Sequence, residues 1–242
     1  MKKGRAWFAV AAVIGLACWI RRGPIPERIL DQQRFASVTV VDRNGVVLYE
    51  PLSLAGGRGE ALGAASLPWR VVEATLVAED RRFFHHIGID PMAVARAAWH
   101  NVRSGRLAEG GSTISQQVAK VLLGYSDRGV VAKARESLLA LRLEHRYSKR
   151  EILAMYLNIA PYGNRIHGIG RASRVYFGCG PDELTAAQAA LLAALPQRPS
   201  AFNPLRDPNA AAARQRYVLA RMRLTEDERK HALTERLQFS GD

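Results

Sequence analysis

Residues 79–90 read EDRRFFHHIGID and directly follow a stretch with helical apolar spacing at residues 71–77. A helix of this kind would carry the Glu79 carboxylate to the edge of a packed core. Burial there would disfavour the charged carboxylate and raise its pKa toward the range of a general base at neutral pH. Taken alone, the run also admits a helix end in water that does no chemistry. In either case we expect Asp90 to cap a helix that begins at Pro91.

A second dense run, GGSTISQQ at residues 110–117, precedes another stretch of helical apolar spacing. Ser112 or Thr113 is the expected N-cap, although a capping box counted from Ser112 fits poorly because Ser115 is neither Glu nor Gln. Free N–H groups at a helix start attract phosphate or carboxylate. Gln117 and Lys120 lie one turn apart and could face the same ligand. The two runs together predict an acid/base site beside an anion-binding helix start.

The remaining chain predicts a hairpin followed by helix after helix, so the expected fold class is mainly α. Residues 37–41 and 46–50 flank the turn sequence Asp42-Arg43-Asn44-Gly45, a strong hairpin signal. Helix starts are predicted by Asp207 before Pro208 and by three capping boxes, at Ser148–Glu151, Thr185–Gln188 and Thr225–Glu228.

The N-terminus predicts a membrane anchor. Lys2, Lys3 and Arg5 precede an uncharged, mostly apolar run at residues 6–20, which Arg21-Arg22 close. At about 1.5 Å per residue the run spans about 23 Å, short of a hydrocarbon core of about 30 Å. Interfacial tryptophans and snorkelling basic side chains could cover the difference. A cleaved signal peptide, or lipidation at Cys18, is the alternative to a retained anchor.

The chain resembles glycosyltransferase family 51, the peptidoglycan glycosyltransferases that polymerise lipid II. Five motifs in the family's order cover about residues 65–223: EDxxFxxHxGxD at 79–90, GSTIxQQ at 111–117, KxxE at 133–136, SKxxILxxYLN at 148–158 and RxxxVLxxM at 214–222. Other pieces are most similar to the C-type branch of class A penicillin-binding proteins. The resemblance implies either a monofunctional transglycosylase or the transglycosylase module of such a protein.

The resemblance implies a lysozyme-like helical glycosyltransferase domain with a small jaw subdomain. We expect residues 1–22 to form the anchor, residues 23–64 the linker and hairpin, residues 65–225 the glycosyltransferase domain and residues 226–242 a C-terminal tail. The implied place is the inner (cytoplasmic) membrane, crossed once, with the catalytic domain on the periplasmic or extracytoplasmic side.

The resemblance also implies roles for the site residues. Glu79 would be the general base of an inverting transfer, and Glu136 the second catalytic residue, positioning groups or a divalent cation at the departing diphosphate. Lys133 and Glu136, three residues apart, share a helix face. Phe83, Trp99 and Tyr156 are expected in the core or the cleft wall, and Asn158 is expected to orient the site. The expected substrate-binding residues are Asp80, Phe83, His86, Ser112, Thr113, Gln117, Lys120, Arg128, Lys133 and Asn158.

Five positions depart from the family's usual residues: Ala132 replaces an Arg, Ala154 a Glu, Cys179 a Lys, Ser115 a Thr and Val121 an Asn. Ala132 matters most, because a bidentate Arg beside a diphosphate is difficult to replace. Arg128, one helical turn away, could partly substitute. These departures leave two alternatives open. One is a lysozyme-like peptidoglycan hydrolase; the other is a catalytically weak, membrane-anchored module that binds lipid II or peptidoglycan.

Composition indicates an anionic partner. There are 35 basic and 22 acidic residues, a net charge of +13, but no nucleic-acid-binding motif, so no nucleic acid is expected. Lipid II, the nascent glycan chain and anionic membrane lipids fit this charge. We expect no organic cofactor and no structural zinc. A divalent cation, Mg or Mn, could bind at the diphosphate of the substrate. The absence of Ser-x-x-Lys and Lys-Thr-Gly predicts that any transpeptidase partner is separate from these residues.

Overall fold

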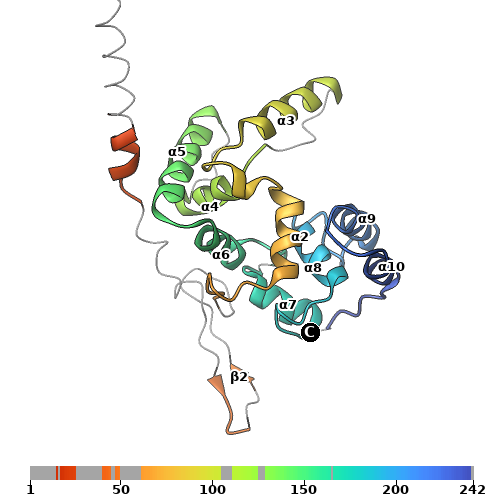
Figure 1. Ribbon diagram of the computed structural model, residues 1–242. Helices are drawn as coiled ribbons and strands as arrows, with labels where there is room; N and C mark the ends of the chain where they lie inside the picture. The colour runs from red at the N-terminus through yellow and green to blue at the C-terminus, as the bar shows by residue number, and fades with distance from the viewer. Residues whose placement is uncertain are drawn as a thin grey trace, which may run out of the picture.

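The computed structural model describes residue 15 and residues 17–25, 40–44, 47–49, 61–104, 111–124, 129–164 and 166–240. The described chain is mainly helical, as the sequence predicts (Figure 1). Its elements are β1 (Val40–Val41), β2 (Val47–Tyr49), α2 (Trp69–Glu79), the 3-10 helix η3 (Phe83–His85), α3 (Pro91–Ser104), α4 (Ile114–Leu123), α5 (Val130–Arg146), α6 (Lys149–Ile159), α7 (Ile169–Phe177), α8 (Ala186–Ala194), α9 (Pro208–Leu219) and α10 (Glu226–Thr234).

The predicted hairpin is confirmed in its described part. Strands β1 and β2 pair antiparallel, with Val40 opposite Tyr49 and Val41 opposite Val47. The turn between them is fixed locally, because the Asp42 carboxylate accepts the Asn44 backbone N–H at 2.8 Å, as expected for an Asx turn. The hairpin stands apart from the helical body (Figure 1).

The core of the helical body forms around α8, whose sequence AAQAALLAA is apolar on almost every side. A helix that is apolar all round must be buried, and α2 and α9 pack against it. Its alanines let these neighbours approach closely. Helix α2 therefore has one face on α8, and its last residue, Glu79, reaches the edge of this core.

Helices α4, α5 and α6 pack together as a second layer beside α2. A polar link holds the three: the Ser115 hydroxyl donates to Glu144 at 2.5 Å, and Lys149 donates to the same oxygen at 2.7 Å. The Lys149 ammonium also lies 4.3 Å from the ring centre of Phe83, which is fully buried. The start of α4 is thereby placed against the loop that follows α2.

The predicted helix starts are confirmed. Capping boxes form at Ser148–Glu151, Thr185–Gln188 and Thr225–Glu228. Asp207 caps α9 through the N–H of Ala210, and Asp90 accepts the N–H groups of Met92 and Ala93 at the start of α3. These starts could be predicted because a capping box is a local pattern that needs no tertiary partner.

One expectation about position is wrong. Trp99, expected in the core or the cleft wall, lies on α3 with 71% of its surface exposed, because α3 projects from the body (Figure 1). Ala154, where the family usually has a charged residue, is fully buried in α6. The replacement at position 154 therefore lies in the hydrophobic core, and Ala154 does not line the cavity described below.

The C-terminal residues, expected as a tail, pack against the helical body. Helix α10 contacts α8 and α9, and the Arg229 guanidinium donates to the carbonyls of Leu219 and Met222. Farther on, the Phe239 ring stacks on Phe177 with centroids 5.7 Å apart. Residues 226–240 are thus part of the same folded unit as the helices before them.

The segment at residues 17–25 lies against α5. The guanidinium of Arg142 donates to the Pro24 carbonyl at 3.1 Å, and that of Arg146 donates to the Gly23 carbonyl at 2.5 Å. Ile25 is buried in the core. Among the described residues, no helix is both long and apolar enough to span a membrane. Most of the expected anchor, residues 1–22, lies outside the described residues, so the anchor stays a prediction.

Candidate active site

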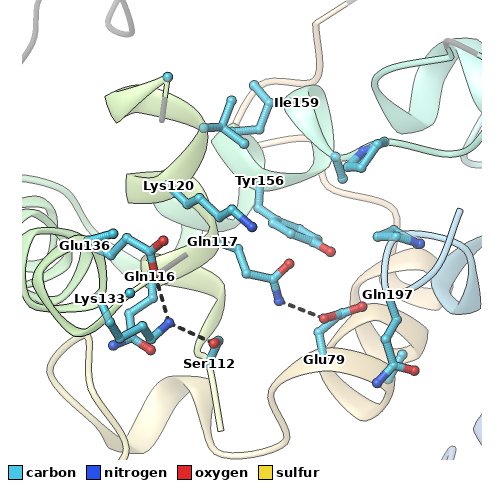
Figure 2. Close-up of a pocket in the computed structure, with 18 residues that line it drawn as sticks. Glu79, Ser112, Gln116, Gln117, Lys120, Lys133, Glu136, Tyr156, Ile159 and Gln197 are labelled. Carbon is cyan, nitrogen blue, oxygen red and sulfur yellow. Dashed lines mark hydrogen bonds and ion pairs between the residues drawn. The ribbon is translucent and has the colours of Figure 1, made fainter. Parts of the chain in front are cut away.

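A cavity of about 680 Å³ opens between the end of α2 and helices α4, α5 and α6 (Figure 2). Its wall includes six of the predicted site residues: Glu79, Ser112, Gln117, Lys120, Lys133 and Glu136. Five of these residues come from three separate motifs of the sequence, and Lys120 follows the second motif by three positions. The packing of α4 on α5 brings the lysines, Ser112, Gln117 and Glu136 together. Chemically, the cavity has two different ends.

Glu79 occupies the dry end of the cavity. Its Oε2 accepts a hydrogen bond from the Gln117 amide at 2.7 Å, while its Oε1 is buried and finds no partner among the described groups. Burial raises the pKa of the Glu79 carboxyl above its usual value, against the opposing effects of the Gln117 hydrogen bond and the Arg214 charge. Glu79 as a whole is half-buried, with its Oε1 atom buried, and its role as a general base stays a prediction.

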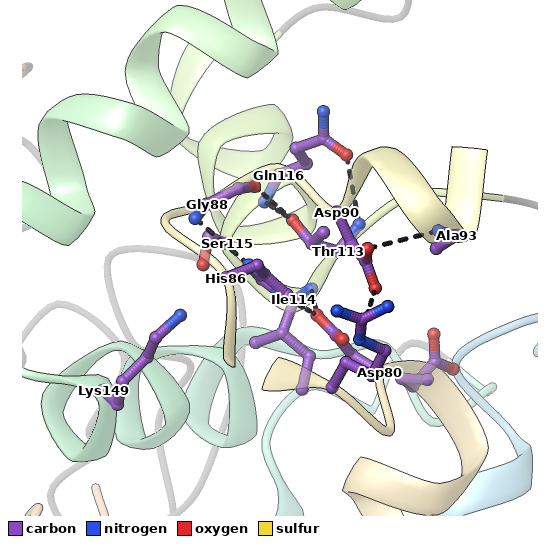
Figure 3. A network of polar contacts seen from close by, with 12 residues as sticks. Asp80, His86, Gly88, Asp90, Ala93, Thr113, Ile114, Ser115, Gln116 and Lys149 are labelled. Atoms are coloured by element: carbon purple, nitrogen blue, oxygen red, sulfur yellow. Dashed lines mark hydrogen bonds and ion pairs between the residues drawn. The ribbon is translucent and has the colours of Figure 1, made fainter. Parts of the chain in front are cut away.

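Asp80, the next residue, has the opposite environment (Figure 3). Its Oδ2 accepts the backbone N–H of Ile114 at 3.0 Å and lies 2.9 Å from Nε2 of His86. The other ring nitrogen of His86 accepts the N–H of Gly88 at 3.1 Å, so the neutral ring carries its proton on Nε2 and donates it to Asp80. Asp80 thus ties the end of α2 to the start of α4.

These contacts show which N–H groups at the start of α4 are already used by the protein, and an anion site there stays a prediction. The anion at that helix start is the protein's own Asp80, which takes the Ile114 N–H. Thr113 is the N-cap, and it forms a capping box with Gln116, one residue later than the box tested from Ser112. The N–H groups of Thr113, Ile114 and Gln116 are therefore occupied by the protein and are not donors to a substrate phosphate.

A glycine is required where this network turns. Gly88 has φ of +97°, a conformation that side chains rarely adopt, and an added Cβ would lie 3.0 Å from the Ala140 backbone on α5. The Gly88 carbonyl accepts the Thr113 hydroxyl at 2.6 Å. The chain between η3 and α3 is therefore held between α4 and α5.

The other end of the cavity is cationic. The Lys133 ammonium donates to Glu136 at 2.9 Å and to the Ser112 hydroxyl at 2.8 Å, which confirms that Lys133 and Glu136 share a face of α5. Lys120 also lines the cavity, and its ammonium has no hydrogen-bond or ion-pair partner within the part of the chain that the structure describes. Ala132 is part of the wall as well, whereas Arg128 lies outside the described residues.

Five predicted substrate-binding residues do not line the cavity: Asp80, Phe83, His86, Thr113 and Asn158. All five are buried. The Asn158 side chain accepts the Leu62 N–H at 2.8 Å and donates to the Leu62 carbonyl at 3.0 Å. The contacts of these side chains hold the backbone around the cavity, so in this structure they support the site from behind.

The cavity also has wall residues that were not predicted as site residues. Tyr156 lies beside Glu79, as expected for a cleft wall, and Gln197 extends from the loop after α8 (Figure 2). Gln116 and Pro161 contribute too. For Gln197 the only sequence signal was a proline-punctuated loop. Nothing local to that loop indicates that it lines the same cavity as Glu79.

The described chain is a helical domain with one cavity that carries a carboxylate at one end and an ammonium cluster at the other. The sequence model of the family described as Transglycosylase matches residues 50–223. The chain therefore belongs to this family.

Curated relatives agree with this assignment. The chain is 45% identical over 156 residues to penicillin-binding protein 1A of Aquifex aeolicus, covering 64% of this chain and 22% of that protein. It is 39% identical over 227 residues to penicillin-binding protein 1C of Escherichia coli, covering 92% of this chain and 29% of that protein. The chain thus spans less than a third of the length of these relatives.

Among solved structures, penicillin-binding protein 1A of Haemophilus influenzae matches with a TM-score of 0.47 and 22% identity, over 84% of this chain and 21% of that chain. At this TM-score the structural likeness adds nothing to the sequence match.

Proposed function

We propose that this chain is a peptidoglycan glycosyltransferase that polymerises lipid II into β-1,4-linked glycan strands, with inversion and release of undecaprenyl diphosphate. One observation carries the proposal: a single cavity holds a buried, weakly acidic carboxylate at one end and an ammonium–carboxylate–hydroxyl cluster at the other. Glycosyl transfer from a diphosphate needs both, a base for the attacking hydroxyl and positive charge for the leaving group.

At the dry end, Glu79 takes the proton from the 4-hydroxyl of the acceptor sugar. The raised pKa of Glu79 makes the carboxylate a stronger base than an exposed one. Gln117 donates a hydrogen bond to one carboxylate oxygen, and the other oxygen has no partner among the described groups. The acceptor oxygen then attacks the anomeric carbon of the growing chain, and a single displacement of this kind inverts that carbon.

At the cationic end, the departing diphosphate is neutralised where its charge develops. Lys133 and Lys120 supply the positive charge, and Ser112 and Glu136 hold the Lys133 ammonium in place. We assign Glu136 this positioning role, because diphosphate is already a good leaving group and needs no proton. Arg128 is proposed as a further cation on the strength of the sequence alone.

The described residues do not form a metal-binding site of three or more protein ligands. No group of three or more His, Cys, Asp or Glu side chains comes together within the described ranges, and Glu136 is the one carboxylate in the cationic wall. A Mg or Mn ion usually takes one or two protein carboxylates plus phosphate oxygens. Such an ion would be held mainly by the diphosphate of the substrate, and no step of the proposed transfer requires it.

The membrane assignment belongs to the same proposal. We infer a retained single-pass anchor within residues 1–22, with the catalytic domain outside the cytoplasmic membrane. Lipid II, the nascent glycan, membrane lipids and a separate transpeptidase are the proposed partners. Mass spectrometry of protein extracted from membranes is expected to find the N-terminal segment. A mature chain that starts beyond residue 20, or a lipid on Cys18, would contradict the retained anchor.

The deciding experiment is incubation of the purified protein with lipid II, followed by separation of the products by length. Polymerised glycan is the expected result. Shortened fragments from isolated cell-wall sacculi would instead indicate a hydrolase. Lipid II that is bound without turnover would indicate a binding module and would overturn the proposed transfer.

A further inference from the structure

Two buried polar atoms on the wall of the cavity lack hydrogen-bond partners among the described groups. One is Oε1 of Glu79, and the other is the hydroxyl of Tyr156. Both residues line the same cavity, and the Tyr156 hydroxyl points toward the Glu79 carboxylate (Figure 2). Buried donors and acceptors are nearly always paired in proteins, so a free donor beside a free acceptor requires an explanation.

Charge connects the same two groups. Burial raises the pKa of the Tyr156 phenol well above its usual value, and the Glu79 charge raises it further. The Tyr156 hydroxyl therefore keeps its proton at any working pH and can act only as a donor toward a carboxylate. Glu79 accepts one hydrogen bond, at Oε2, so its Oε1 atom can accept another.

We propose that Tyr156 is a positioning residue for Glu79, whose hydroxyl donates to the free carboxylate oxygen when Glu79 is ionised. The two oxygens are not hydrogen-bonded to each other in the structure, so the contact requires a rotation of the Glu79 side chain. Glu79 is the last residue of α2, where a side chain has fewer neighbours than in a helix interior. Tyr156, on the buried face of α6, provides the fixed partner.

The proposal also explains how a dry carboxylate can remain a usable base. The other groups that act on the Glu79 charge are Gln117 on α4, Arg214 on α9 and the adjacent Asp80. Tyr162, after α6, is affected by it as well. Gln117 and Arg214 oppose the cost of burial, and Tyr156 would add a third favourable contact from α6. A carboxylate with too few such contacts would stay protonated and could not accept a proton.

The test is a titration of Glu79 in the full-length protein by ¹³C NMR of its carboxyl carbon, assigned with Glu79→Gln. In Tyr156→Phe we expect the pKa of Glu79 to rise by about one unit, since a donor to the charged form is lost. Tyr176→Phe is the matched control. Its hydroxyl is committed to the Tyr162 carbonyl at 2.9 Å, so its loss should leave the Glu79 titration in place.

Thermal unfolding gives a second readout, because the two variants should depend on pH differently. Tyr176→Phe removes a made hydrogen bond and should lower the melting temperature at every pH, whereas Tyr156→Phe should lower it only above the pKa of Glu79, where the proposed hydrogen bond forms. An unchanged Glu79 titration in a folded Tyr156→Phe protein would overturn the proposal.

The titration does not depend on turnover, although the role of Glu79 as a base rests on the proposed function. A protein that fails to polymerise lipid II, but whose Glu79 titration shifts in Tyr156→Phe, refutes the function and keeps the contact. In an active protein, the acidic limb of the rate profile should move to higher pH together with the titration.

Discussion

The two ends of the cavity have opposite effects on a negative charge. At the end of α2, Glu79 is withdrawn from water and has one hydrogen-bond donor. On α5, Lys133 has two acceptors and 45% of its side chain exposed. The dry end makes a negative charge less favourable before the reaction, and the open end makes a new negative charge more favourable during it.

This contrast shows that the surroundings of a carboxylate, more than whether it belongs to Asp or Glu, decide whether it can act as a base. Glu79 and Glu136 line one cavity, yet Glu136 is tied to an ammonium and Glu79 is not. Asp80, next to Glu79 in the chain, is tied to a helix start and to a histidine. Of these three carboxylates, only Glu79 is left in a setting that suits a base.

The strongest test removes the charge at the dry end. Glu79→Gln should lower the rate of lipid II polymerisation by about 10²- to 10⁴-fold, the usual contribution of a general base. Initial rates with purified protein measure the loss. Glu151→Gln is the matched control: Glu151 serves only the capping box of α6, so turnover should hardly change. A Glu79→Gln protein that keeps more than about a tenth of the normal rate would show that Glu79 is not the general base.

At the cationic end, Lys133→Met keeps the aliphatic stem and deletes the ammonium. Hydrogen bonds to charged groups are worth about 1.5 to 3 kcal/mol, so the rate should fall by about ten-fold to a hundred-fold. Glu136→Gln should act in the same direction, since it releases the Lys133 ammonium. Lys133→Arg keeps the charge and should lose less. If Met and Arg at position 133 have equal rates, positive charge at this end is not what the reaction uses.

The contrast can also be sharpened by adding charge. Ala132→Arg places a guanidinium in the cavity wall beside Lys133, where the family usually has one. The polymerisation rate should rise by about ten-fold, the equivalent of ~1.4 kcal/mol. Ala132→Gln tests the added bulk without the charge. A rate that does not respond to Arg at position 132 means that Arg128 already fills the role or that the diphosphate lies elsewhere. Repeating the change with Arg128→Ala separates those two outcomes.

The smallest expected effect is on stability. Because burial raises the pKa of Glu79 in the folded protein, its contribution to stability is lost as the pH rises through that value. Glu79→Gln should therefore raise the melting temperature at neutral pH, by about 2 to 4 °C, and the gain should shrink on acidification. Calorimetry over a pH series measures it.

Glu151 provides the control of opposite sign. Hydrogen bonds from Ser148 lower the pKa of Glu151, so its contribution is present at neutral pH and lost as the pH falls through the folded value. Glu151→Gln should slightly lower the melting temperature at neutral pH. Equal shifts in both variants would contradict the assignment of Glu79 to a dry site.

Local patterns allowed much of the fold to be predicted. The capping boxes at Ser148 and Thr185 need only two residues three apart, and the hairpin at Asp42 needs only its turn. The burial of Glu79 could be predicted as well, because the apolar spacing before it places the helix end against a core. The capping boxes and the hairpin turn depend on contacts within one helix or one turn, and the burial at Glu79 follows from the apolar face of a single helix.

Contacts between distant segments could not be predicted in this way. Asp80 and Ile114 are 34 positions apart, and no local pattern indicates that the start of α4 is already occupied by a carboxylate. The same holds for Thr185, whose hydroxyl bonds to Glu235 across 50 positions and helps to join the supposed tail to the body. The sequence indicated which groups could bind an anion, but not that the protein would supply the anion itself.

Hydrogen bonds from α5 to residues 23 and 24 determine where a pulling force on the N-terminal chain would act. Arg146 holds the Gly23 carbonyl across 123 positions of the chain, and a side chain at Gly23 would collide with the guanidinium of Arg142. A pull on the chain before residue 21 would therefore load α5 before it reached the hairpin. Since α5 also carries Lys133 and Glu136, such a force would act first on the helix that holds the cationic end of the cavity.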